Sequence, residues 1–251
     1  MADLTVTLEQ RHEPLLITAR VPHGVVCGHP WGIALDGLLA AQIHAQRKAA
    51  AVDAGRPLSR VADVDDPADL DLPLSRCSGD GDDWHWAATC AYPTNGHELL
   101  PDVRTVTGFL DERAHEQLSS GLPTVVHLGR GRYRNRLISL MATPCSHLVW
   151  HAVGDRERVD ELLAPVAAIG RRRAGGEGRV LSWSVEPAPG LGVWEASHLS
   201  PAGTLGRPCP PACTAARGDV LDGGLSSAGI RPPYMHRGRQ RVLLVPPAVA
   251  P

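Results

Sequence analysis

Residues Ser146–Val153 read Ser-His-Leu-Val-Trp-His-Ala-Val and begin the stretch that decides the fold. This segment is predicted to be a β-strand. Asp155 can then cap the start of a helix. Apolar residues recur along one stripe of that helix: Val159, Leu162, Leu163, Val166 and Ile169. Pro165 lies inside the helix and can kink it, Gly170 can end it, and Val180–Val185 alternates as a strand.

The segments before this stretch complete a recognisable order of elements. Leu4–Leu8 alternates as a strand that Leu15–Val21 continues, and Leu35–Ala51 carries apolar residues at helical spacing. Further strands are predicted over Trp84–Tyr92, Val103–Leu110 and Thr124–Leu128. The order strand, helix, strands, helix, strand is the βαββαβ order of the ferredoxin-like fold. This α+β fold has an open antiparallel sheet, which is a common platform for binding RNA.

The chain is predicted to divide into a core and an extension. Its 251 residues suffice for one large domain with a real core. Residues 1–186 are expected to form the ferredoxin-like core, with an acidic insertion at about residues 53–83. Residues 187–251 are rich in proline and glycine. They are predicted to pack on the core as an irregular C-terminal extension, within which Val242–Val245 can form a closing strand.

Charge is distributed unevenly, although the net charge is only −2. Residues 1–125 hold nine Lys and Arg against 18 Asp and Glu, whereas residues 126–251 hold 16 against nine. Every cation of the second half is arginine, whose planar guanidinium matches phosphate. Asp63–Asp83 contains eight aspartates and would repel nucleic acid. We therefore expect this acidic half to face solvent or a protein partner.

A basic, glycine-rich loop separates the second predicted helix from the last strand. Residues Ile169–Val180 read Ile-Gly-Arg-Arg-Arg-Ala-Gly-Gly-Glu-Gly-Arg-Val. Arginine forks bind phosphate in a bidentate manner, and glycines let a backbone approach a phosphodiester. The loop therefore predicts binding of a polyanion, with RNA as the leading candidate, through Arg171, Arg172, Arg173, Gly175, Gly176, Gly178 and Arg179. The alternative is a solvated helix end followed by a flexible turn.

A second basic patch reads Gly-Arg-Gly-Arg-Tyr-Arg-Asn-Arg over residues 129–136. As an extended strand it places its arginines on one face and its single aromatic ring on the other. The ring can stack on a base while the arginines hold phosphates. The predicted RNA contacts are Arg130, Arg132, Tyr133, Arg134 and Arg136. The alternative is an exposed hairpin that codon usage has made rich in arginine.

Further cations lie in the C-terminal extension, where they either line an RNA groove or are solvated: Arg207, Arg231, His236, Arg237, Arg239 and Arg241. Of these, Arg207 and Arg237 are predicted to contact RNA. Asp36 could contact a partner, but an acid in the first turn of a helix is already explained by the helix dipole.

The six cysteines permit two sets of metal ligands. One set lies in the second half of the chain: Cys209, Cys213, His198 and His236. The other lies in the first half: Cys77, His85, Cys90 and His97. Neither set has the paired Cys-x₂-Cys spacing that is typical of zinc ribbons. Reduced thiols in apolar surroundings are the simpler interpretation, so we expect no metal and no other cofactor.

Six blocks of sequence, mainly within residues 30–40 and 130–235, carry a resemblance to a known family: Leu35–Ala40, Trp150–Asp155, Ile169–Gly170 with Gly175–Val180, Trp183–Glu186, Gly206–Pro208 and Arg231–Tyr234. Together they resemble the RAMP superfamily. More narrowly, the chain resembles the Cas-five-like backbone-capping subunit of type IV CRISPR effector complexes. Glu177 departs from the family pattern, because it places an acid inside a loop meant for phosphate.

The resemblance implies a non-catalytic subunit on a ferredoxin-like, RRM-like domain that binds the 5′ handle of the guide RNA (crRNA). It would cap the backbone of an antiviral ribonucleoprotein complex. The implied partners are the guide RNA and the backbone and large subunits, with target nucleic acid contacted only indirectly. We expect a cytoplasmic protein without a membrane partner, because the chain begins without a signal peptide and no apolar run approaches the roughly 18 residues that cross a bilayer.

The alternative function is catalytic. Some RAMP proteins cleave RNA without metal, and here His151, His236 and Tyr133 could act as general acid or base in processing the guide. Nucleotide-hydrolysing and dinucleotide-binding enzymes are not indicated. The chain has no Gly-x₄-Gly-Lys-Ser/Thr motif, and no Gly-x-Gly-x₂-Gly follows its first strand.

Overall fold

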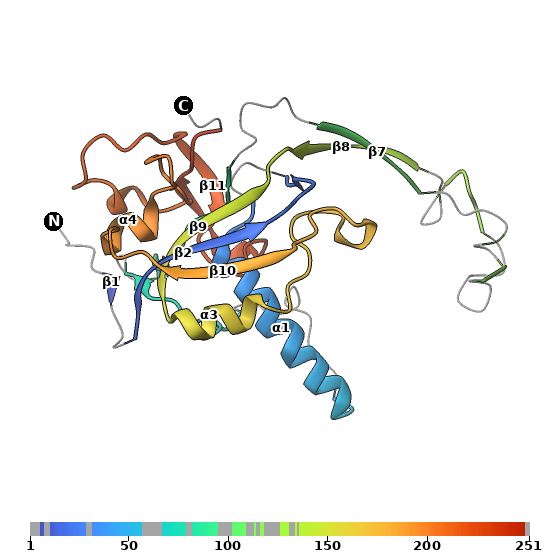
Figure 1. Ribbon diagram of the computed structural model, residues 1–251, viewed down its shortest axis with the longest axis horizontal. Coiled ribbons are helices and arrows are strands. Elements are labelled where there is room, and N and C mark those ends of the chain that lie inside the picture. The colour runs from blue at the N-terminus through green and yellow to red at the C-terminus, as the bar shows by residue number, and fades with distance from the viewer. Residues whose placement is uncertain are drawn as a thin grey trace.

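A four-stranded antiparallel sheet lies at the centre of the protein, with its strands in the order β10-β2-β9-β6 (Figure 1). The computed structural model describes residues 6–7, 11–28, 32–56, 67–78, 82–94, 102–108, 113, 116–117, 126–130, 134 and 136–248. Over these residues the chain is an α+β protein in which all paired strands are antiparallel. The central strands are β2 (Glu13–Arg20), β6 (Tyr92–Thr94), β9 (His147–Gly154) and β10 (Ser182–Pro187).

Side-chain alternation explains why this sheet is covered on both faces. Trp150 lies opposite Ile17 in the register, and both are fully buried on the face that packs against the two main helices. Val153 points to the other face and packs against Ala196 of α4 (Val193–His198). The predicted strands Ser146–Val153 and Val180–Val185 are confirmed as β9 and β10.

The two main helices are α1 (Leu35–Asp53) and α3 (Arg156–Leu163), and they pack against each other. Only the first turns of α1 contribute large side chains to the core, and Figure 1 shows its second half protruding from the body. Asp155 caps α3 as predicted, because its carboxylate accepts a hydrogen bond from the Arg158 amide. The helix ends before Pro165, whose lack of an amide hydrogen prevents the predicted continuation to Ile169.

A long two-stranded arm extends from one end of the sheet (Figure 1). It consists of β7 (Asp102–Gly108) and β8 (Arg136–Thr143), and β3 (Val25–Val26) pairs with the base of β8. The predicted strand Val103–Leu110 is confirmed where it is described. Residues 126–128 of the predicted strand Thr124–Leu128 are not in a strand, and its first two residues lie outside the described chain.

A small three-stranded sheet forms beside the central one, in the order β1-β4-β5. Its strands are β1 (Val6–Thr7), β4 (Arg76–Cys77) and β5 (His85–Trp86). The first predicted strand is therefore not continued by β2, because it pairs with a different sheet. The predicted strand Trp84–Tyr92 is likewise divided, with its two ends in β5 and β6.

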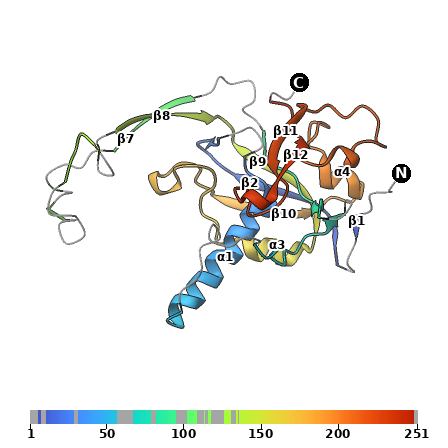
Figure 2. The same cartoon turned by 180° about the vertical axis from the view of Figure 1, so that it is seen from behind.

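The C-terminal extension contains more regular structure than its composition predicts. It comprises α4, two short 3₁₀ turns and one hairpin: η4 (Pro211–Cys213), η5 (Arg237–Arg239), β11 (Leu225–Gly229) and β12 (Gln240–Leu244). The predicted closing strand is confirmed as β12. Seen from behind in Figure 2, the hairpin and α4 cover one side of the body, while the arm extends from the other end. No helix among the described residues combines the length and apolar composition that a bilayer crossing demands.

Candidate nucleic-acid interface

The arginine–glycine loop, residues 170–179, is held at its base and open at its tip. The Arg171 amide donates to the Val26 carbonyl over 2.7 Å, and the Ile169 amide donates to the Gly178 carbonyl over 2.9 Å. Between these anchors the chain makes the 3₁₀ turn η3 (Arg173–Gly175). The sequence therefore places the predicted phosphate-binding residues on a defined turn between α3 and β10.

The glycines of this loop divide into two roles. Gly178 has a φ of +64°, and an added Cβ would lie 1.9 Å from the Ile169 carbonyl oxygen, so the fold itself requires glycine there. Gly175 and Gly176 have nothing within 4 Å of such a Cβ, and both are exposed. Their bare backbone is therefore open to a ligand. The sequence predicted this role for Gly178 as well, but Gly178 is buried.

The loop arginines, Arg171, Arg172, Arg173 and Arg179, are all exposed. Within the described chain, none of the four guanidinium groups forms a hydrogen bond or ion pair with a protein group. Arg172 has a φ of 61° and is the one non-glycine residue with positive φ in the described chain. This conformation costs about 1 kcal/mol, so the turn holds Arg172 in a backbone conformation that an L-residue ordinarily avoids.

The acid inside the loop is neutralised by a residue of the arm. The Glu177 carboxylate forms an ion pair of 2.5 Å with the Arg104 guanidinium on β7. Arg104 also pairs with Asp102 and donates to the His23 carbonyl, and Asp102 raises the pKa of Arg104. Glu177 therefore does not present a free negative charge at the tip of the loop. Sequence reasoning missed Arg104, because nothing local links β7 to a loop more than 70 residues later.

The second basic patch is only partly described. Arg130 follows a turn, Arg136 begins β8, and both are exposed, as is Arg134. Arg132 and Tyr133 lie outside the described residues, so the predicted stacking of a base on Tyr133 stays a prediction. The bend at Arg130 does not fit the idea that the whole segment is one extended strand.

Arg207 occupies a place that does not suit RNA binding. Its side chain is 1% exposed, and its guanidinium donates to the carbonyls of Trp86, Ala88 and Ile230. Its nearest carboxylate oxygen, Oδ2 of Asp36, lies 3.6 Å away. We therefore assign Arg207 to packing of the core, which corrects its place among the predicted RNA contacts.

Asp36 and Tyr234 complete a buried network around this arginine. The Tyr234 hydroxyl donates to Asp36 over 2.6 Å, and burial raises the pKa of Tyr234 well above its ordinary value. Gly37 leaves room for the phenol ring, whose nearest carbon would lie 3.2 Å from an added Cβ. Three of the blocks that carry the family resemblance thus meet here, and Asp36 is an internal partner rather than a surface contact.

The remaining extension arginines mostly neutralise the acidic insertion. Arg231 is buried and pairs with Asp69 and Asp82, while its guanidinium lies 4.2 Å from the Trp84 ring. Arg239 also pairs with Asp69. Arg241 in turn pairs with Asp82 and Asp83. The described part of the insertion is therefore docked on the extension and not simply turned to solvent. Arg237 is exposed, as RNA contact would require.

The histidines considered for catalysis are both buried. His151 on β9 donates from Nδ1 to the Leu199 carbonyl over 3.0 Å, and burial lowers the pKa of His151. His236 accepts a hydrogen bond from the Gly238 amide through Nδ1. A buried, internally bonded imidazole is poorly placed to reach a ribose hydroxyl, so this geometry gives the catalytic alternative no particular support.

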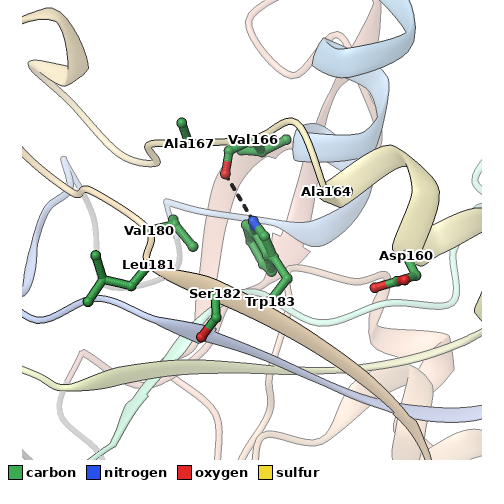
Figure 3. Close-up of a pocket in the computed structure, with 8 residues that line it drawn as sticks. All are labelled: Asp160, Ala164, Val166, Ala167, Val180, Leu181, Ser182 and Trp183. Carbon is green, nitrogen blue, oxygen red and sulfur yellow. Dashed lines mark hydrogen bonds between the residues drawn. The ribbon is translucent and has the colours of Figure 1, made fainter.

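A pocket of about 310 Å³ lies between the end of α3 and the start of β10 (Figure 3). Six of its eight lining residues are of apolar type, and Asp160 is its only ionisable group. The Trp183 indole lines the pocket and donates to the Val166 carbonyl over 2.9 Å. The pocket lining contains an acid and no cation, so it does not suit phosphate. The pocket is therefore not part of the phosphate-binding surface predicted for the arginine–glycine loop.

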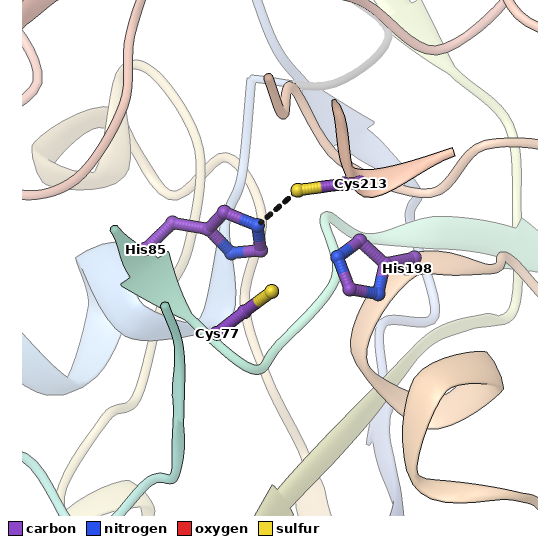
Figure 4. A group of neighbouring side chains, drawn as sticks. All are labelled: Cys77, His85, His198 and Cys213. Carbon is purple, nitrogen blue, oxygen red and sulfur yellow. Dashed lines mark hydrogen bonds between the residues drawn. The ribbon is translucent and has the colours of Figure 1, made fainter. Parts of the chain in front are cut away.

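The structure also brings together one pair from each of the two possible metal-ligand sets. Cys77, His85, His198 and Cys213 are buried, and their ligand atoms lie within 4.8 Å of one another. Figure 4 shows the four side chains converging from separate segments. Cys90, Cys209 and His236 are not members of this cluster, and His97 lies outside the described residues. Spacing along the sequence missed the combination, because the ligands come from distant parts of the chain.

These features define an α+β protein with a central antiparallel sheet, a projecting arm and an exposed arginine–glycine loop. A family model described as CRISPR type IV associated protein Csf3 matches residues 13–191. The chain belongs to this family and is thus a subunit of a type IV CRISPR complex. The match runs from β2 to just before α4, so it includes the central sheet, the arm and the loop. No match was found among curated proteins.

Proposed function

We propose that this chain binds the 5′ handle of the guide RNA and caps the backbone of a type IV CRISPR ribonucleoprotein complex in the cytoplasm, without catalysing a reaction. The observation that carries this proposal is the loop at residues 170–179, whose four exposed arginines form no ion pair with any acid in the described part of the chain. Arginine forks and open glycine backbone suit a sugar–phosphate chain, whose contacts fix the position of RNA without reading its sequence.

A ferredoxin-like, RAMP-type architecture is part of the proposal. Support comes from the strand order β10-β2-β9-β6, in which α1 lies between β2 and β6 in sequence and α3 lies between β9 and β10. These six elements, taken in chain order, have the βαββαβ sequence. The arginine–glycine loop then follows the last helix of the unit, where the resemblance to RAMP proteins places it.

Contact with a neighbouring subunit is proposed for the arm. One face of β7–β8 exposes Val103, Leu137 and Met141 with 60%, 71% and 57% of their surface, and Val103 lies opposite Met141 in the register. Exposed apolar side chains gathered on one face are typical of an interaction surface. A backbone or large subunit is the proposed occupant, and the target nucleic acid would be reached only through such partners.

The test compares two triple variants for binding to RNA derived from the CRISPR repeat. Replacing Arg171, Arg172 and Arg173 with alanine should weaken binding and reduce the slope of log affinity against log salt by about 0.7 for each lost phosphate contact. The control replaces Arg47, Arg56 and Arg158, which are exposed elsewhere, and removes the same charge. Equal losses in both triples would contradict a specific role of the loop.

The same RNA serves to test the absence of catalysis. Incubated with the protein in EDTA, repeat RNA should stay intact. Cleavage that His151→Ala or His236→Ala abolishes would instead support the metal-independent endoribonuclease.

A further inference from the structure

We propose that Cys77, His85, His198 and Cys213 bind a structural zinc ion that fastens the C-terminal extension to the core. The four side chains are at most 4% exposed and point toward a common centre (Figure 4). Two thiols and two imidazoles are a ligand set that zinc commonly takes in structural sites. This inference is independent of RNA binding and concerns residues outside the arginine loop.

The distances fit a tetrahedral zinc site after a small contraction. With Zn–S near 2.3 Å and Zn–N near 2.0–2.1 Å, neighbouring ligand atoms of a tetrahedron lie about 3.3–3.8 Å apart. Nε2 of His85 already lies 3.4 Å from Sγ of Cys213. No two ligand atoms of the cluster lie more than 4.8 Å apart, so shifts of about 1 Å complete the geometry.

Both imidazoles are held in the tautomer that zinc requires. Nδ1 of His85 lies 2.9 Å from the Trp86 carbonyl, and Nδ1 of His198 lies 3.0 Å from the Trp194 carbonyl. A carbonyl oxygen can only accept, so each Nδ1 carries the hydrogen and each Nε2 carries a lone pair. Metal-binding histidines are oriented in this way, with the second ring nitrogen donating to a carbonyl or carboxylate.

His198 supplies the observation that points most directly to a ligand. Its Nε2 atom is buried and makes no hydrogen bond within the described residues. Leaving a buried polar atom without a partner costs about 1–3 kcal/mol, so such atoms usually mark a missing water, ion or ligand. Nε2 belongs to the group of atoms that converge on the cluster, where a zinc ion would satisfy it.

The surroundings hold the ligands in place. The Trp194 ring stacks on His198, with ring centroids 5.0 Å apart, and its indole donates to the Cys213 carbonyl over 3.0 Å. The Trp86 carbonyl that orients His85 also accepts from the buried guanidinium of Arg207. Zinc with two thiolates and two neutral imidazoles carries no net charge, so it adds no repulsion beside that arginine.

The positions of the ligands explain why the site would be structural. Cys77 lies on β4 and His85 on β5, whereas His198 ends α4 and Cys213 lies in η4. Four protein ligands leave no open coordination position for a substrate. His85 and Cys213 are 128 positions apart, so one ion would close a long loop and join the small sheet to the extension.

The direct test measures zinc in the full chain, purified without chelators and without added metal. Elemental analysis should find one zinc ion per chain. Cys77→Ser, His85→Asn, His198→Asn and Cys213→Ser should each lose most of the zinc. Cys90→Ser, Cys145→Ser and His151→Asn are matched controls, since these residues are buried outside the cluster and should keep it.

A second measurement keeps the proposal falsifiable if the ligand variants do not fold. Cobalt substituted into the wild-type chain should give the visible absorption of a tetrahedral site and a thiolate-to-cobalt charge-transfer band. A metal-free, folded wild-type chain with no cobalt spectrum would overturn the proposal. So would a disulfide between Cys77 and Cys213, located by peptide mapping, which would leave four reactive thiols instead of six in the denatured chain. Loss of zinc in Cys209→Ser but not in Cys213→Ser would overturn the ligand assignment.

Discussion

The phenol of Tyr234 donates a hydrogen bond of 2.6 Å to the carboxylate of Asp36, and the two residues lie 198 positions apart. Oδ1 of Asp36 accepts both this bond and one from the Gly37 amide, while Oδ2 faces Arg207 at 3.6 Å. The contact therefore joins the first turn of α1 to the C-terminal extension. It also places a carboxylate opposite the buried guanidinium of Arg207.

Replacement of Tyr234 by phenylalanine should lower the free energy of unfolding by about 1–3 kcal/mol, since Asp36 then loses a buried donor. Asp36→Ala should cost more, about 3–5 kcal/mol, because it leaves the Arg207 charge buried without its carboxylate. Urea denaturation of both single variants and the double variant would measure their coupling. Additive effects would mean that the hydrogen bond contributes nothing to stability.

Arg104→Ala should weaken RNA binding about fivefold, which corresponds to about 1 kcal/mol, because Glu177 would then repel phosphate at the loop. Adding Glu177→Gln should restore most of the affinity, since the unpaired acid is gone. Fluorescence anisotropy with labelled repeat RNA would measure both. If the double variant binds as weakly as Arg104→Ala, Arg104 acts by some other route than masking the acid.

Gly178→Ala should destabilise the chain by about 1–3 kcal/mol, because a Cβ would collide with the Ile169 carbonyl and φ is positive. Gly175→Ala is the matched control for folding, since its Cβ meets open space. Thermal unfolding should therefore separate the two variants. In RNA titrations, Gly175→Ala should still reduce affinity if the backbone of the loop approaches phosphate.

His151 should make stability depend on pH in a defined direction. Burial lowers the pKa of His151 below its ordinary 6.5, so the unfolded chain takes up a proton there at a higher pH than the folded chain. Stability is then fully present above pH 6.5 and is lost as the pH falls through 6.5 toward the lower folded value. Denaturation of His151→Asn should show a shallower loss between pH 7 and 5 than the wild type. If His151→Asn loses as much stability as the wild type over this pH range, other histidines cause the pH dependence.

Local patterns predicted the elements that build the central sheet and the loop beside it. Alternation in Ser146–Val153 and Val180–Val185, and helical spacing in Leu35–Ala51, depend only on neighbours in sequence, so they could be read directly. The end of α3 was misjudged because apolar spacing continued past Pro165, while the missing amide hydrogen stopped the helix. Apart from the closing strand β12, the short elements of the extension have too little periodicity to be predicted.

The sequence by itself determined that this chain carries consecutive arginines in a glycine-rich loop between a helix and a strand, because charge, backbone freedom and periodicity are local properties. Only the tertiary structure decided which cations are free for a ligand: Arg171 is free, whereas Arg207 and Arg231 are buried against carboxylates and carbonyls. It also decided that Cys77 and His85 meet His198 and Cys213. Contacts of this kind depend on which distant segments of the chain fold together. The spacing of residues along the sequence does not give the distance between those segments in space.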